Sequence, residues 1–278
     1  MIRSRSLAAL SAVLMLGGCG TYVPAMQEIG ENPSALSEFT PGGAFEFKIR
    51  AKVYCDIVDA VLAARGAGIL PTGWAVQTTL DLQVDETGSL NPGATFIDPM
   101  AASQSFTLGV GGVLSSASTR EDKYGTYWDL DKLQTRTGNP CRPKGEQVVG
   151  SSLLLSELGI SDWLIDSLRT RDYLPSSAGV KGDPFFKQDF LSYHIKFVVV
   201  SSGGVTPTWK LVRISTGNGG LPLVGAGRTR SHDLLLTFGP TFKAGAPNLA
   251  ASSHAAQDFG IAVSNGARTG IRTFAPPR

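Results

Sequence analysis

The chain has 278 residues, 42% of them hydrophobic, and carries 25 Lys and Arg against 23 Asp and Glu, a net charge of +2. This near balance argues against a nucleic acid or a broadly anionic membrane surface as partner, because both attract a clear excess of basic side chains. The length suffices for one large domain or two small ones.

A short apolar segment follows a basic N-terminus. Arg3 and Arg5 precede the apolar run at residues 7–16. Ten residues are about half of the roughly 20 that a membrane-spanning helix requires. The arrangement is typical of a secretory signal peptide, so we expect residues 1–18 to direct export.

The signal segment ends on Leu16-Gly17-Gly18-Cys19. This stretch resembles the lipobox of bacterial lipoproteins. The resemblance implies cleavage before Cys19, acylation of Cys19, and a mature chain of 260 residues held to a membrane by its acyl chains. It also implies the outer membrane of a Gram-negative cell, with the folded part facing the periplasm, because Gly and not Asp follows the cysteine. A plain signal peptide with an incidental cysteine is the alternative.

Residues 19–43 contain three prolines and no lasting periodicity, so we expect a tether between the lipidated N-terminus and the folded part. Residues 44–68 then place apolar side chains at every fourth position and end near Gly66. This spacing predicts an amphipathic helix. The first half also alternates, so a strand leading into a helix remains open.

Strand patterns follow. Residues 74–88 alternate between apolar and polar side chains and predict a half-buried strand that ends in a turn. Residues 105–116 form the next predicted strand, and residues 124–133 its partner, joined by the polar sequence STRED.

The second half of the chain begins with a predicted helix at residues 151–171, in which Ser161 is a plausible cap. Predicted strands follow at residues 190–201, 208–215 and 232–239. A short helix is predicted at residues 252–263 and a frayed tail at residues 273–278. Residues 201–204, SSGG, predict the turn between the first two of these strands. We therefore predict an α+β fold, with a mainly antiparallel sheet of about six strands and two or three helices, as one periplasmic domain over residues 44–272.

The cysteines allow a simple assignment. If Cys19 carries lipid, Cys55 and Cys141 remain, in a compartment where disulfides persist. We predict that these two are bonded to each other, with buried thiols as the alternative.

Catalytic templates are absent. The sequence has no G-x-S-x-G, no H-E-x-x-H and no C-x-x-C, and its three histidines make a zinc site built on histidine hard to assemble. Asp129 and Asp131 would share a strand face and could hold a hard cation with water, but two carboxylates alone are a poor cage and the pattern favours a solvated strand face. We predict no catalytic residue, no metal site and no cofactor.

Two of the three histidines lie in predicted strands. His194 lies beside Lys196 on the polar face of its predicted strand, which favours a solvent-facing side chain. His232 and Asp233 are adjacent, so on a strand they point to opposite faces and cannot pair simply.

Four residues are possible surface contacts. Tyr127 and Trp128 should face opposite ways on a strand, so one packs in the core and the other suits contact with a protein or a glycan. Arg228 and Arg230 could grip an anionic partner, or form an ordinary loop before a strand.

The function expected from these features is that of a lipid-anchored, non-catalytic binding or scaffold module at the outer membrane, with an envelope protein, or a glycan or lipid at that membrane, as partner. The alternatives are a periplasmic hydrolase with a dispersed active site, and a carrier of small molecules or lipids. A hydrolase requires histidine or aspartate beside a nucleophile, a carrier a dry cavity of several hundred Å³, and a binding module an exposed apolar patch or open sheet edge.

Overall fold

A computed structural model describes residues 23–26, 40–99, 105–135, 141, 156–174, 189–205, 214–216, 221–241 and 249–274. The signal segment, Cys19 and most of the expected tether lie outside this part of the chain. Within it, no helix is both long and apolar enough to span a membrane.

The described elements form an α+β fold, which confirms the predicted class. Their order along the chain is α2 (Pro41–Gly66), β1 (Trp74–Leu90), β2 (Gly93–Pro99), β3 (Ser105–Gly111), β4 (Leu114–Asp129), the 3₁₀ helix η1 (Leu130–Thr135), α4 (Ile160–Tyr173), β5 (Leu191–Val205), β6 (Ile214–Thr216), β7 (Val224–Pro240) and α5 (Leu249–Phe274).

These strands form two sheets where the sequence predicted one. The larger has the strand order β4-β1-β7-β5, and the smaller the order β3-β2-β6. The described chain divides into two compact units. Unit 1 comprises 1–26, 82–122 and 198–231, and unit 2 comprises 27–81, 123–197 and 232–278.

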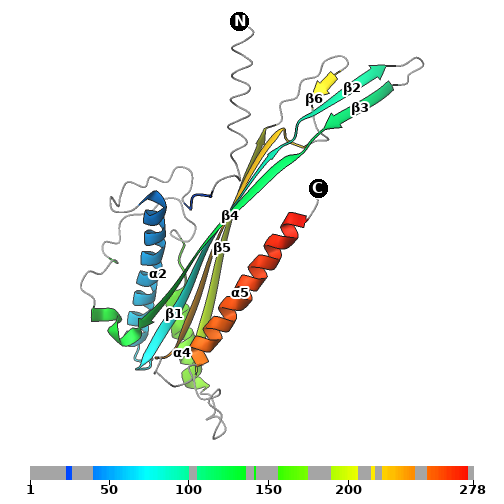
Figure 1. Cartoon of the computed structure of the whole chain (residues 1–278). Helices are drawn as coiled ribbons and strands as arrows, with labels where there is room; N and C mark the ends of the chain where they lie inside the picture. Colours follow the sequence, from blue (N-terminus) through cyan, green and yellow to red (C-terminus); the bar gives the residue numbers. More distant parts are fainter. Residues whose placement is uncertain are drawn as a thin grey trace. The chain divides into compact units, whose positions relative to one another are not determined.

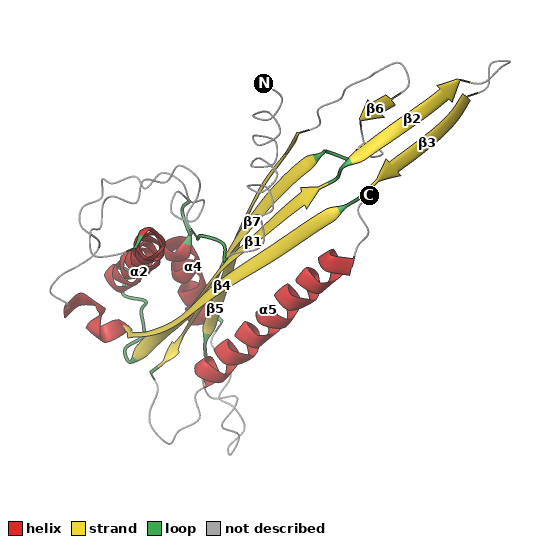
Figure 2. Ribbon diagram, turned by 45° about the horizontal axis from the view of Figure 1, so that its top comes forward, coloured by secondary structure: helices red, strands yellow, loops and turns green. Residues whose placement is uncertain are grey.

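Unit 2 has three layers. Helices α2 and α4 cover one face of its portion of the large sheet, and α5 covers the other (Figures 1 and 2). Along β1 and β7, alternate side chains therefore point to α5 or to the α2 and α4 layer.

Helix α2 begins three residues earlier than predicted. Thr40 caps it, accepting a hydrogen bond from the amide of Gly43 at 3.3 Å, and Pro41 occupies the first turn. The recurring apolar side chains are buried along one side, at Phe45, Ile49, Val53 and Ile57. The helical spacing thus prevails over the alternation, and the strand alternative for this segment is wrong.

Helix α4 confirms a helix in the second half of the predicted segment, but its cap is not Ser161. The N-cap is Gly159, whose φ of 64° is a conformation that glycine adopts without strain. Trp163 then stacks on Tyr193 of β5 at 4.7 Å between ring centroids and contacts Phe238 of β7 at 5.9 Å. These contacts fix α4 on its face of the sheet.

The limits of several strands differ from the prediction. STRED lies inside β4 and is not a link, because its alternate side chains suit a strand with one exposed face. Residues 201–204 lie inside β5 and do not make a turn. Residues 105–116 are two strands, since β3 ends at Gly111 and β4 begins at Leu114.

Helix α5 is longer than predicted. It runs to Phe274, so part of the expected tail is helical. It also approaches β7 closely: a Cβ placed on Gly239 would lie 2.5 Å from the Cβ of Ala250. Glycine is therefore required at position 239 for α5 to pack this closely on the sheet.

Candidate functional site

The face of the unit 2 sheet that lies under α5 carries polar side chains. His254 of α5 is buried, with Nε2 2.9 Å from Oγ1 of Thr79 on β1 and Nδ1 2.8 Å from Oγ1 of Thr237 on β7. Burial lowers the pKa of His254. A neutral imidazole has one donor and one acceptor nitrogen, so the two hydroxyls satisfy both.

A second polar contact lies nearby on the same face. The hydroxyl of Ser192 on β5 donates to Oε1 of Gln257 at 2.6 Å. Like the contact of His254, it joins a strand of the sheet to α5, so these groups are used in holding the helix to the sheet.

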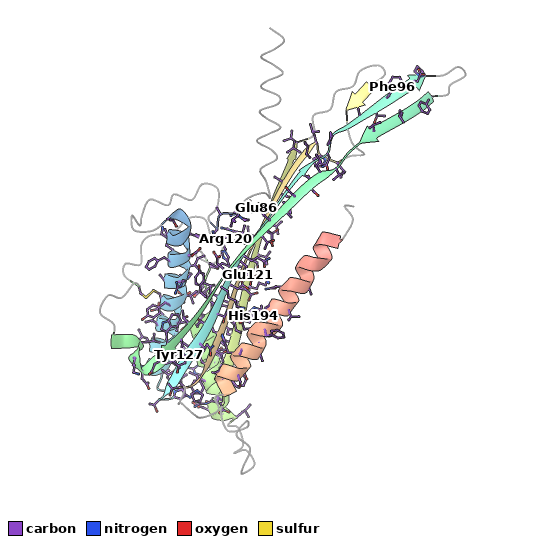
Figure 3. The ribbon with its side chains drawn as sticks, viewed as in Figure 1. Glu86, Phe96, Arg120, Glu121, Tyr127 and His194 are labelled. Atoms are coloured by element: carbon purple, nitrogen blue, oxygen red, sulfur yellow. A yellow bond between two sulfur atoms is a disulfide. The ribbon has the colours of Figure 1, made fainter. Side chains whose placement is uncertain are left out.

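The third cluster contains an acidic side chain that is nearly inaccessible. Asp233 of β7 is 4% exposed, accepts a hydrogen bond from Nε2 of His194 on β5, and forms an ion pair with Nζ of Lys196 at 3.1 Å. Lys196 also donates to Oδ1 of Asn265 on α5 at 2.7 Å. His194 remains largely exposed, and Figure 3 labels it on its strand.

The pairing of His194 with Asp233 was missed by sequence reasoning. Alternation correctly placed His232 and Asp233 on opposite faces: His232 lies near the ring of Phe45 on α2, at 6.1 Å between centroids. The partner of Asp233 depends on β5 being the neighbour of β7, and no local pattern encodes that order. The only signal was the polar face shared by His194 and Lys196.

These clusters lack the geometry of hydrolytic catalysis. In the described part of the chain, the hydrogen bond of His194 goes to Asp233 and not to a hydroxyl. His254 does contact hydroxyls, but it is buried together with them. A nucleophile must be in reach of both its base and the substrate. His194 contacts no hydroxyl among the described residues, and at His254 the hydroxyl of Thr237, though 2% exposed, belongs to a residue that lines a small pocket.

A pocket of about 180 Å³ opens at the first turn of α5. Its lining consists of Ala75, Gln77, Tyr127, Thr237, Gly239, Pro240, Ala250 and Ala251. This volume is below the roughly 300–1,000 Å³ of usual small-molecule sites. Within the described residues, the pocket is thus smaller than the cavity expected of a carrier.

Tyr127 and Trp128 divide as the alternation predicted. Tyr127, labelled in Figure 3, is 50% exposed and lines the pocket. Trp128 is half-buried, edge-on against Tyr54 of α2 at 5.3 Å between centroids. Tyr127 alone is therefore suited to contact a partner.

The arginine pair is not a surface cluster. Arg230 is 3% exposed, and burial lowers its pKa to about 10, so it remains a cation at neutral pH. Arg228 forms an ion pair with Glu86 and donates to the carbonyl of Ala25. The two arginines lie in β7 and not in a loop before it, so the expectation of an exposed cationic grip is wrong.

Asp129 and Asp131 do not share a strand face. Asp129 ends β4 and pairs with Lys132 at 2.9 Å, and this hydrogen bond holds the pKa of Asp129 below its usual value. Asp131 lies in η1 and accepts a hydrogen bond from the amide of Gly73 at 2.9 Å. Both carboxylates thus brace a turn. Among the described residues, no group of three or more His, Cys, Asp or Glu could hold a metal ion.

Cys55 and Cys141 are joined by a disulfide, with 5.5 Å between their Cα atoms. The bond ties the middle of α2 to the chain 86 residues further on. Cys19 lies outside the described residues.

Unit 1 presents apolar side chains to solvent on its small sheet. Strands β2 and β3 pair antiparallel from Gly93↔Gly111 to Pro99↔Ser105, and β6 pairs with the other edge of β2. Phe96, labelled in Figure 3, lies opposite Leu108, and both are exposed. An exposed apolar sheet face of this kind is typical of an interaction surface.

No family model and no curated protein matches the chain. Among solved structures, it is similar to the secretin InvG of the Salmonella SPI-1 type III secretion injectisome in the open gate state, over 68% of this chain and 66% of that chain. The identity is 8% and the TM-score is 0.15, so this likeness carries no argument about fold or function.

Proposed function

We propose that this chain is a lipid-anchored protein of the cell envelope, held at the outer membrane through Cys19, whose folded part faces the periplasm as a non-catalytic binding module. The observation that carries this proposal is the exposed apolar face of β2 and β3 in unit 1. Such a face favours association with a partner, because contact removes apolar area from water.

The polar clusters of unit 2 support binding over catalysis. Enzymes keep their acid, base or nucleophile directed at the substrate. Here both nitrogens of His254 engage threonine hydroxyls, and Asp233 engages His194 and Lys196. These contacts stabilise the stack of sheet and helix.

The sequence supports the location. A basic start, a short apolar run and Cys19 occur in the order of a lipoprotein signal. The disulfide between Cys55 and Cys141 suits an oxidising compartment outside the cytoplasm.

The test is the intact mass of the protein extracted from membranes, beside a Cys19→Ser variant. We expect the wild type to begin at Cys19 with acyl mass added and to stay with the outer-membrane fraction after a carbonate wash. The variant should carry no acyl mass and leave that fraction. A wild-type chain without acyl mass would refute the anchor.

A periplasmic hydrolase is the second candidate, favoured by the contact between His194 and Asp233. It predicts turnover of chromogenic ester, peptide or glycoside substrates that is lost in a His194→Ala variant. Turnover that depends on His194 would replace the binding proposal. Turnover unchanged by the substitution would exclude this pair as the active site.

A further inference from the structure

Charge is segregated along the strands of unit 1. Residues 87–119 contain a single charged side chain. Ionic contacts resume at the limits of this stretch, where Glu86 pairs with Arg228 and Arg120 pairs with Asp122 at 2.5 Å. A surface sheet in water normally carries many charged side chains on its solvent face.

The register of β2 and β3 sorts the uncharged side chains onto two faces. Directly opposite residues of an antiparallel pair point to the same face, and neighbours along a strand point to opposite faces. One face, here called the apolar hairpin face, is formed by Ala94, Phe96, Phe106, Leu108 and Val110, with Asp98 as its one charged member. The other consists mainly of small or weakly polar residues, Gly93, Thr95, Thr107, Gly109 and Gly111, with Ile97 as its one large apolar member.

The apolar hairpin face stays open to solvent within the described chain. The exposed fractions are 48% for Phe106, 50% for Leu108 and 67% for Val110. An apolar face that is this exposed to water is typical of a surface that binds a protein or a membrane.

Two observations favour lipid over a protein as the partner of this face. Protein interfaces usually have a polar rim that includes charged side chains, but here the opposite face is uncharged and the apolar hairpin face carries a single charge, that of Asp98. Along β1 and β4, charged groups begin only at Glu86 and Arg120, inward of the first hairpin pair Gly93↔Gly111, as expected where a protein leaves an apolar phase for an aqueous one. Asp98 lies on the apolar hairpin face opposite Phe106, at the outer end of the pairing, where its carboxylate must stay at headgroup depth.

The strand order limits how the hairpin meets a membrane. β3 is an edge of its sheet, so one row of its backbone groups is unpaired within the described chain. Unpaired backbone groups cannot enter hydrocarbon without a large cost in free energy. An orientation parallel to the membrane surface keeps this row at headgroup depth.

We propose that the apolar hairpin face adsorbs to the surface of a lipid bilayer, with its apolar side chains among the acyl chains and the opposite face toward the headgroups and water. This gives the protein a second contact with the membrane, independent of the acyl chains on Cys19. It deepens the proposed function by naming lipid as the partner of the exposed face, and it rests on that proposal only for the location.

The first experiment measures co-sedimentation of the full chain with phosphatidylcholine vesicles in a Cys19→Ser background. Phe96→Ser/Leu108→Ser should weaken the partition coefficient at least about tenfold, because it removes two large apolar contacts. Phe259→Ser is the control: this residue of α5 in unit 2 is also an exposed phenylalanine, at 72%, and its removal should change binding less than about twofold. Equal binding by the hairpin variant and its parent would overturn the proposal.

The second experiment locates the contact. In the Cys19→Ser background, Cys55 and Cys141 are bonded to each other, so an introduced cysteine is the reactive thiol. A polarity-sensitive fluorophore on Leu108→Cys should shift to the blue with vesicles, and one on Thr107→Cys, on the opposite face, should not. Equal shifts at both positions, or none, would contradict the stated orientation.

Two further outcomes separate the alternatives. Binding that requires phosphatidylglycerol would point to charge attraction and overturn an apolar contact. A blue shift at Leu108→Cys without vesicles that grows with protein concentration, with a dimer by light scattering, would assign the face to a second copy of the chain. None of these results depends on acylation, so a failure here is distinct from a failure of the anchor.

Discussion

Nε2 of His254 lies 2.9 Å from Oγ1 of Thr79, which joins α5 to the central strand β1 through a buried polar contact. The other ring nitrogen contacts Thr237 of β7. This one imidazole therefore links α5 to two adjacent strands, and it holds the helix in a defined register on a face where apolar packing alone would permit sliding.

The pH dependence of stability should reflect His254. Burial lowers its pKa below the usual 6.5, Asp258 opposes this shift, and Lys123 reinforces it. The unfolded chain therefore binds a proton near pH 6.5 that the folded chain excludes. The free energy of unfolding should fall as the pH drops below about 6.5 and level off below the pKa of the folded state. Urea unfolding between pH 4.5 and 8 measures this.

His254→Gln provides the comparison, since it retains hydrogen-bonding groups but does not titrate. Its unfolding free energy should be lower than that of the wild type at pH 8, with a shallower slope between pH 5 and 7. The same slope in both proteins would show that another group is responsible.

A methyl group on Gly239 should displace α5. Its Cβ would lie 2.5 Å from Cβ of Ala250, so Gly239→Ala is expected to destabilise the protein by about 1–3 kcal/mol. Gly260→Ala, in α5 itself, is the control, because a Cβ there would meet nothing within 4 Å. It should stabilise by about 0.5–1 kcal/mol, from helix propensity. Thermal unfolding of the two variants should move in opposite directions, and a common direction would contradict this packing.

Removing the charge of Asp233 should weaken the contact between β7 and β5. Asp233→Asn leaves Lys196 without its buried counter-charge and should destabilise by about 1–3 kcal/mol. Asp172→Asn, which disrupts the exposed pair with Arg171, should change stability by less than about 0.5 kcal/mol. Urea unfolding of both variants is the measurement, and equal effects would indicate that Asp233 is solvated.

The disulfide should stabilise unit 2. The chain-entropy model gives about 4–5 kcal/mol for a loop of this length, an upper figure in practice, so Cys55→Ala/Cys141→Ala should lower the unfolding free energy by about 2–4 kcal/mol. Wild-type protein unfolded under reducing conditions should match the double variant. Two thiols that react with a maleimide in the unreduced, denatured chain would show that the bond is absent.

Local patterns predicted much of the fold. Apolar residues at every fourth position marked α2, and strict alternation marked β1, because these spacings decide which face of an element is buried. Other predictions were wrong because the local sequence favoured a different structure. STRED contains polar residues that read as a link, and SSGG is a common turn sequence, yet both lie within long strands whose partners supply the pairing.

The candidate surfaces were harder to predict. The sequence places Arg228 and Arg230 in a loop before a strand that begins at residue 232. In the structure β7 begins at Val224 and includes both, and Arg228 is ion-paired while Arg230 is buried. The apolar face of β2 and β3 was not predicted, because the sequence analysis gave no strand at residues 93–99 and a single strand over residues 105–116. Their register, which puts Phe96 and Leu108 together, exists only once they pair.

The sequence by itself determined the α+β class and the scarcity of charge in residues 87–119, since composition and spacing are properties of a linear chain, and it predicts the signal segment with Cys19. The tertiary structure decided which strands are neighbours, and hence that Asp233 meets His194 and that His254 lies between two threonines. Such pairings join residues tens to hundreds of positions apart, and the packing of whole elements, rather than any local preference, selects among them.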